Sequence, residues 1–136
     1  MGRLYEVTVE KDENVKEKIT QYILEQGWED VYISGAVGSV RNVKLTNPVS
    51  AEFPPRVGTT ECAGPCEVVA FTGEVMKRER MDPVLEKIYP DKTCPLFVHV
   101  HASVGVAGSH MYGGGFHDGY AFRKLRVFLQ PLDEQE

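Results

Sequence analysis

Only one stretch of this 136-residue chain has the apolar spacing of a helix, and this constrains the fold more than any other feature. Apolar residues recur there at i, i+4, i+7 and i+8, which places them on one helical face. They are Val15, Ile19, Tyr22 and Ile23. The pattern predicts a helix over residues 13–26, with Asp12 as its N-terminal cap and Gly27 as its C-terminal stop.

The other apolar segments have the character of β-strands. Residues 4–10, for example, alternate between apolar and polar side chains, as a half-buried strand does. We expect further strands over residues 28–46, 67–75, 96–104 and 120–129. Because these strands follow one another without a βαβ alternation, the sequence predicts an α+β fold with a largely antiparallel sheet. We expect a single domain over residues 1–136, with its core over about 3–129 and a frayed acidic tail at 133–136.

The connections between these segments carry their own signals. Residues 47–66 are rich in proline and glycine, which predicts a long loop, with an edge strand expected near Glu52 and Phe53. Asp82 and Pro83 are typical of the start of a short helical segment. The apolar register of the last strand shifts midway, which predicts a bulge near Arg123 and Lys124.

Charge and cysteine content limit the functional classes. The formal net charge is −5, which counts against strong unaided binding to nucleic acid, since phosphate contacts need cations. Two basic clusters, at 77–80 and 123–126, are expected on solvated surface. The three cysteines, an odd number, favour free thiols and a reducing compartment over a disulfide framework. We find no apolar signal-peptide core and no apolar run long enough for a membrane span, so we expect a cytoplasmic protein with no membrane partner.

Two histidines lie two positions apart in the strand expected over residues 96–104. Alternate strand residues share a face, so His99 and His101 point the same way, with Cβ atoms about 7 Å apart. The glycines at 113–115 predict a tight turn that brings His117 within reach. Three imidazoles fit a site for zinc or a similar divalent ion. The alternative is a pair of histidines hydrogen-bonded to backbone.

Three further motifs accompany the histidine strand in a fixed order. They are Ile-Ser-Gly-Ala-Val-Gly-Ser-Val-Arg-Asn-Val at 33–43, Gly-Pro-Cys-Glu-Val-Val-Ala-Phe-Thr-Gly at 64–73, and a Gly-Gly turn that closes at Gly119, with His-Val-His-Ala-Ser at 99–103 before that turn. The ordered set resembles the PPC (plants and prokaryotes conserved) domain over nearly the whole chain, and the stand-alone prokaryotic type in particular.

The resemblance implies a compact β-rich fold with one main helix, assembled as a homotrimer. It also implies a metal site formed by a His-x-His strand and a Gly-Gly-His segment. In this chain the third position of that pattern falls on Gly115. The resemblance therefore supplies His99 and His101, and leaves open whether His117 or His110 replaces the third ligand.

The resemblance further implies the DNA-binding role that the family commonly carries, largely through relatives with AT-hook motifs. This chain has no Arg-Gly-Arg-Pro string. We expect a homotrimeric binding module that associates with DNA or with a DNA-bound protein. The alternative is a small-ligand binder or enzyme that depends on a divalent metal ion, with zinc the expected ion. In that case Glu74 either orients a ligand or is simply a surface carboxylate. The sequence favours binding over catalysis and identifies no catalytic residue.

Overall fold

The computed structural model describes residues 3–90 and 93–133. Its strands are β1 (Tyr5–Glu10), β2 (Val31–Pro48), β3 (Val57–Cys62), β4 (Cys66–Lys77), β5 (Leu96–Val106) and β6 (His110–Pro131). Its helices are α1 (Val15–Gln26) and two short 3-10 segments, η1 (Arg78–Arg80) and η2 (Pro83–Lys87). The predicted α+β class is confirmed, because antiparallel strands dominate and the described residues contain one α-helix.

The strands form one antiparallel sheet in the order β1-β6-β5-β4-β2-β3, with an additional pairing between β6 and β2. The pairings β2–β4, β4–β5, β5–β6 and β6–β2 therefore make a closed circuit. This closure is possible because β2 and β6 are long and irregular, with four register shifts in the ladder between them. One shift lies where Gly38 pairs with Leu125 but Val40 pairs with Ala121, which confirms the bulge expected near Arg123 and Lys124.

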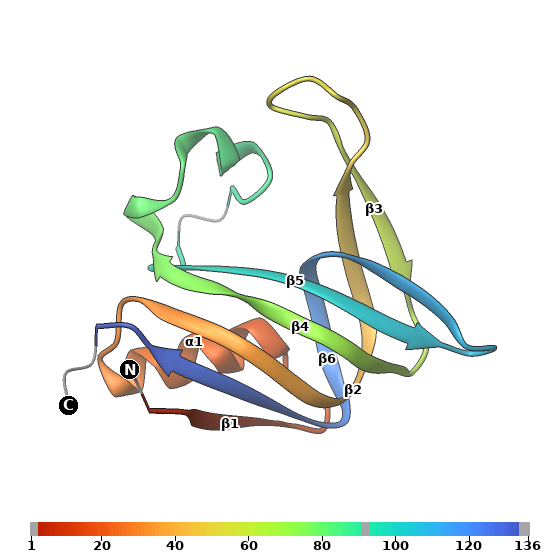
Figure 1. The fold of residues 1–136 in the computed structure, drawn as a ribbon, viewed down its shortest axis with the longest axis horizontal. Helices are drawn as coiled ribbons and strands as arrows, with labels where there is room; N and C mark the ends of the chain where they lie inside the picture. The colour runs from red at the N-terminus through yellow and green to blue at the C-terminus, as the bar shows by residue number, and fades with distance from the viewer. Residues whose placement is uncertain (1–2, 91–92, 134–136) are drawn as a thin grey trace.

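Helix α1 packs its apolar face against β1, β5 and β6 (Figure 1). Val15, Ile19 and Ile23 are completely buried, as the sequence spacing predicts. Beside the helix, the ring of Trp28 makes edge contacts with Tyr5 and Tyr22, at centroid distances of 4.6 and 6.0 Å. Elsewhere in the core, the rings of Phe71 and Phe116 pack edge to face at a centroid distance of 5.4 Å.

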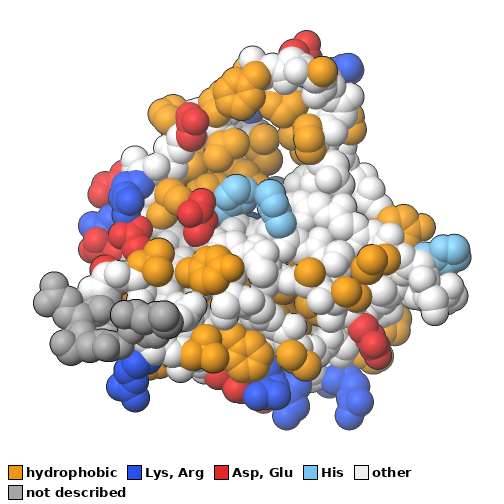
Figure 2. Space-filling view, viewed as in Figure 1, with side chains coloured by type: hydrophobic (Ala, Val, Ile, Leu, Met, Phe, Trp, Pro, Cys, Tyr) orange, Lys and Arg blue, Asp and Glu red, His pale blue; other side chains and the backbone are white. Residues whose placement is uncertain are grey.

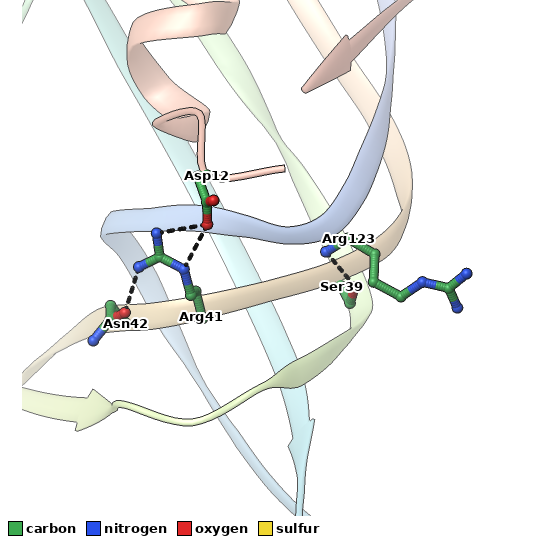
Figure 3. Close-up of polar contacts among 5 residues, drawn as sticks. All are labelled: Asp12, Ser39, Arg41, Asn42 and Arg123. Atoms are coloured by element: carbon green, nitrogen blue, oxygen red, sulfur yellow. Dashed lines mark hydrogen bonds and ion pairs between the residues drawn. The ribbon is translucent and has the colours of Figure 1, made fainter. Parts of the chain in front are cut away.

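The helix begins two residues later than the sequence predicts, at Val15. Asn14, and not Asp12, is its N-cap, and the Asn14 side chain accepts a hydrogen bond from the backbone N–H of Glu17. Asp12 instead has a φ of 69° and pairs with the Arg41 guanidinium at 3.0 Å (Figure 3). Gly27 ends the helix in the left-handed conformation, as predicted.

Two other expectations are wrong. Residues 47–66 are not one loop with an edge strand at 52–53, because β2 runs to Pro48 and β3 spans Val57–Cys62 as a projecting hairpin arm (Figure 1). The glycines at 113–115 do not form the turn, because they lie within β6 and the turn after β5 is at 107–109. The helical segment expected at Asp82 and Pro83 is confirmed as η2.

The tail predicted to fray extends into residues 134–136, which lie outside the described residues. Within the part of the chain that is described, no helix combines the length and the apolar character needed to cross a membrane.

Candidate functional site

His99 and His101 lie side by side on the outer face of β5. Their ring centroids are 5.0 Å apart and the ring planes are nearly perpendicular, at 89°. His99 is half-buried and His101 is exposed. Figure 2 shows histidine side chains near the middle of one face of the molecule, beside a hollow. The sequence therefore predicted correctly that the two imidazoles project together from one strand.

Neighbouring strands supply the surroundings of this pair. On β4, Glu74 is the cross-strand partner of His99 and Thr72 is the partner of His101. These residues line a shallow hollow of about 300 Å³ together with Tyr32. The Glu74 carboxylate lies 3.8 Å from Nδ1 of His99. A carboxylate at this position favours the tautomer with the proton on Nδ1, which leaves Nε2 free to accept or to ligate.

The environment keeps the His99 ring neutral. Partial burial lowers the pKa of His99, and the neighbouring His101 lowers it further, while Glu74 acts in the opposite direction. The ring also stacks on Phe97 at a centroid distance of 5.2 Å. Because metal binding needs a deprotonated imidazole nitrogen, this surrounding suits ligation at neutral pH.

The other side of His101 is open because its cross-strand partner is Gly115 on β6. A second hollow of about 390 Å³ begins there and is lined by Thr46, Asn47 and Ser103. A Cβ atom at position 115 would lie 2.7 Å from Oγ1 of Thr46 and 3.9 Å from the hydroxyl of Tyr89. The Thr46 hydroxyl therefore occupies part of the space that a side chain at position 115 would need.

His117 has a different environment. Its ring lies 6.0 Å from Tyr89, and its backbone carbonyl accepts from Nζ of Lys16 at 3.4 Å. Its Nδ1 is buried and has no hydrogen-bond partner among the described residues. Burial lowers the pKa of His117, with Lys16 as the next cause. His110 is exposed at the start of β6 and pairs with Val106, five positions along β5 from His101.

His99 and His101 supply two of the ligands that a divalent ion needs. His99 and His101 converge, but no group of three or more His, Cys, Asp or Glu side chains arranged to hold a metal ion is found among residues 3–90 and 93–133. Sequence reasoning found the pair because period-two spacing is local. It missed Thr46, Tyr32 and Tyr89, since nothing in their own segments marks them as neighbours of β5.

Two of the three cysteines, Cys62 and Cys66, lie together and apart from the histidines. All three are free thiols, as expected from their odd number. Cys62 and Cys66 are buried near each other at the junction of β3 and β4. Burial raises the pKa of the Cys66 thiol to about 11, and contact with Cys62 contributes to the shift. Such a thiol is protonated at neutral pH and is a poor nucleophile.

Both basic clusters lie on the surface, and one cation of the 123–126 cluster and two of the 77–80 cluster pair with acids. Arg126 forms two contacts with Glu6, at 3.0 and 3.1 Å. In the other cluster, Lys77 pairs with Glu29 at 3.0 Å, and Arg80 pairs with Asp30. Arg123 differs, since its backbone N–H is held by Ser39 while its guanidinium points away from the other residues drawn in Figure 3.

Comparison with known proteins identifies the family. The model of the Plants and Prokaryotes Conserved (PCC) domain matches residues 1–133. The chain belongs to this PPC family. A search of the curated proteins found no match.

Solved structures of PPC-like proteins have the same fold. A plant- and prokaryote-conserved (PPC) protein of Pyrococcus horikoshii is 24% identical, with a TM-score of 0.76 over 99% of this chain and 82% of that chain. A protein of Archaeoglobus fulgidus described as metal-containing is 22% identical, with a TM-score of 0.74 over 96% and 79%. A protein of Bacteroides thetaiotaomicron described as a candidate DNA-binding protein is 14% identical, with a TM-score of 0.72 over 99% and 82%. At these identities the likeness shows the fold alone.

Proposed function

We propose that this PPC-family chain is a binding module that holds a divalent metal ion, with zinc the expected ion, on the His99–His101 pair. The observation that carries the proposal is the 5.0 Å separation of two imidazoles that share one strand face and border an open hollow. The description of the Archaeoglobus relative as metal-containing supports it.

Each residue near the pair has a distinct role in this proposal. His99 and His101 are the ligands, and Glu74 holds the His99 ring with Nε2 directed to the ion. A bound divalent ion would supply Lewis acidity to a small anionic ligand in the open position. His117 stays the proposed third ligand, with His110 as its alternative. The Tyr89 ring lies near both histidines, 6.0 Å from the His117 ring and 6.4 Å from the His99 ring.

Metal titration of the metal-free, untagged protein tests this proposal. Addition of Co²⁺ should produce visible absorption bands that saturate at one ion per chain, and Zn²⁺ should remove them. His99→Ala and His101→Ala should each weaken binding by at least about 10-fold. His110→Ala, at the exposed hairpin, is the control if His117 is the third ligand. Unchanged affinity in the His99→Ala/His101→Ala double variant would refute the site.

A third-ligand test uses the same assay. If His117 joins the ion, His117→Ala should weaken Co²⁺ binding by about 10- to 100-fold. If His110 takes that place, the loss should appear in His110→Ala instead. If neither variant changes the affinity, the third donor is not one of these histidines and that part of the proposal fails.

Self-association is part of the same proposal. We expect a homotrimer, as the resemblance to the family implies, located in the cytoplasm. The mass of one chain is 15.2 kDa, so light scattering on the purified protein should give three times that value. A mass of one chain at micromolar concentration would refute the trimer without affecting the metal site.

DNA association is the second candidate function. The exposed side chains of Arg123 and Lys124 favour it, and so does the description of the Bacteroides relative as a candidate DNA-binding protein. The net charge of −5 predicts that contact is weak or passes through a DNA-bound protein. Duplex binding should fall as salt is added, and Arg123→Gln/Lys124→Gln should lower the log–log salt slope by about 1 per lost phosphate contact. Lys11→Gln serves as the exposed control. Binding that does not depend on salt would refute direct phosphate contact.

A further inference from the structure

A hollow of about 840 Å³ lies between one side of α1 and the start of β5, apart from the His99–His101 pair. Its walls are mostly apolar, with Leu24 from the helix and Leu96, Phe97 and Val98 from β5. The volume is in the range of sites that enclose small organic molecules. Neither His99 nor His101 lines it.

In the described part of the chain, two cationic side chains, Lys16 and Arg78, line this hollow, and the Lys16 ammonium is the one without a close carboxylate or a short backbone partner. Its Nζ lies 5.5 Å from the centre of the Tyr89 ring and within 3.4 Å of the His117 carbonyl. Among the described residues, no carboxylate lies within ion-pair distance of this nitrogen. Burial lowers the pKa of Lys16, and the nearby Asp118 only partly offsets the effect. An anion bound beside Nζ would restore the missing partner of a half-buried charge.

His117 adds a second donor to the same wall. Because its Nδ1 is buried without a partner, and an unpaired buried N–H is rarer than an unpaired acceptor, the proton is expected on Nε2. Nε2 is then the nitrogen available to a ligand, and it donates. Lys16 and His117 thus present hydrogen-bond donors at one end of an apolar hollow.

The acidic groups nearby do not neutralise this end. Asp118 is the carboxylate whose charge acts most on Lys16. Its Oδ1 already accepts hydrogen bonds from Nδ2 of Asn14 at 2.8 Å and from the backbone N–H of Gly119 at 2.9 Å. Glu17 and Glu25 line the hollow, but both are exposed on the helix. The Arg78 guanidinium also lines it and donates to the backbone carbonyl of Tyr89.

We propose that this hollow is a binding site for a small organic carboxylate with an apolar body, the carboxylate lying against Lys16 and His117 and the apolar part against Leu24, Leu96 and Phe97. The chemistry follows from donors at one end and hydrocarbon along the rest. The proposal concerns the state in which His117 does not ligate an ion, and it does not require metal at the His99–His101 pair.

Paired probes of equal apolar size test the site. Octanoate and octanol are titrated into the protein, with binding followed by displacement of a fluorescent naphthalene sulfonate dye. Octanoate should bind at least about 10-fold more tightly than octanol, a difference of about 1.4 kcal/mol that a hydrogen bond to a charged group is strong enough to supply. Lys16→Met should abolish this preference. Lys18→Met, on the same helix and paired with Glu13, should retain it.

Two further measurements locate the binding. Leu24 is 48% exposed, so Leu24→Trp should fill the hollow without loss of the fold and should weaken both probes. The free thiol of Cys94 lines the hollow, so octanoate should slow its alkylation by iodoacetamide. Equal binding of octanoate and octanol, an unchanged preference in Lys16→Met, or an unchanged alkylation rate at saturating octanoate would each overturn the proposal. Metal binding by the Lys16→Met variant should be unaffected, which separates this test from that of the proposed function.

Discussion

The chain contains two histidine environments that lie close in the fold but differ in strand pairing and in the charged groups beside them. The His99–His101 pair is on the outer face of β5, open to solvent and beside a carboxylate. His117 is only two residues beyond Gly115, the cross-strand partner of His101, yet it faces Lys16 and Tyr89.

The cause of this difference is a change of strand partner. β6 pairs with β5 from His110 to Gly115, and beyond that point it continues along β2, where Phe116 pairs with Leu45. His117 therefore lies past the end of the ladder that carries the histidine pair. The spacing of two residues within one strand therefore predicts that their side chains lie close together, whereas their spacing across a turn does not.

The largest expected effect would break the strand pairing that holds the histidine pair. A Cβ atom at Gly73 would lie 2.1 Å from the backbone oxygen of His99, so Gly73→Ala forces β4 and β5 apart. We expect a loss of about 3 kcal/mol in the free energy of unfolding, measured in urea. Gly105→Ala is the matched control on the same strand pair, because its nearest contact would be an ordinary 3.8 Å. Equal stability of the two variants would contradict the contact.

The next effect is a loss of metal affinity when Glu74, the carboxylate beside His99, is changed. Glu74→Gln keeps the shape of the side chain but removes the charge beside Nδ1 of His99. Metal affinity at the pair should fall by about 10-fold. Glu67→Gln, an exposed carboxylate elsewhere on β4, should leave the affinity unchanged. A similar loss in both variants would point to general electrostatics and not to orientation of the His99 ring.

A third effect is the pH dependence of stability, to which both histidine environments contribute in the same direction. The folded pKa values of His99 and His117 lie below the ordinary value near 6.5, with burial as the first cause in each. Below about pH 6.5 the unfolded chain therefore binds protons that the folded chain does not, so stability falls as pH decreases through the folded pKa values. Urea unfolding of metal-free protein between pH 7 and pH 5 should show this slope. His99→Gln/His117→Gln should flatten it, and an unchanged slope would contradict the assignment.

The smallest expected effect is a change in stability when Lys16, beside His117, is replaced. Lys16→Met replaces a half-buried charge, whose pKa burial lowers, with an apolar side chain of similar length. In ligand-free protein the free energy of unfolding should stay the same or rise by up to about 1 kcal/mol, so the variant should be at least as stable as the original protein. Lys18→Met, which removes a partly exposed pair with Glu13, should be neutral or slightly destabilising. A clear loss in Lys16→Met would show that the ammonium has a stabilising partner.

Local patterns in the sequence predicted the helix, its glycine stop, the bulge of the last strand and the joint direction of His99 and His101. They failed where two local signals competed. Asp12 and Asn14 are both good caps, and the choice between them depends on Arg41, which lies far along the chain. The glycines at 113–115 have the composition of a turn, but they lie in β6, where Gly114 and Gly115 permit close approach of Asn47 and Thr46.

Residue periodicity was enough to predict the α+β class and the shared face of the two imidazoles, because helical and strand periodicities depend only on neighbours along the backbone. The position of His117, in a separate hollow with Lys16 and Tyr89, followed from the folded arrangement. That outcome depends on where β6 exchanges β5 for β2 as its partner, and strand partners are set by packing between distant segments.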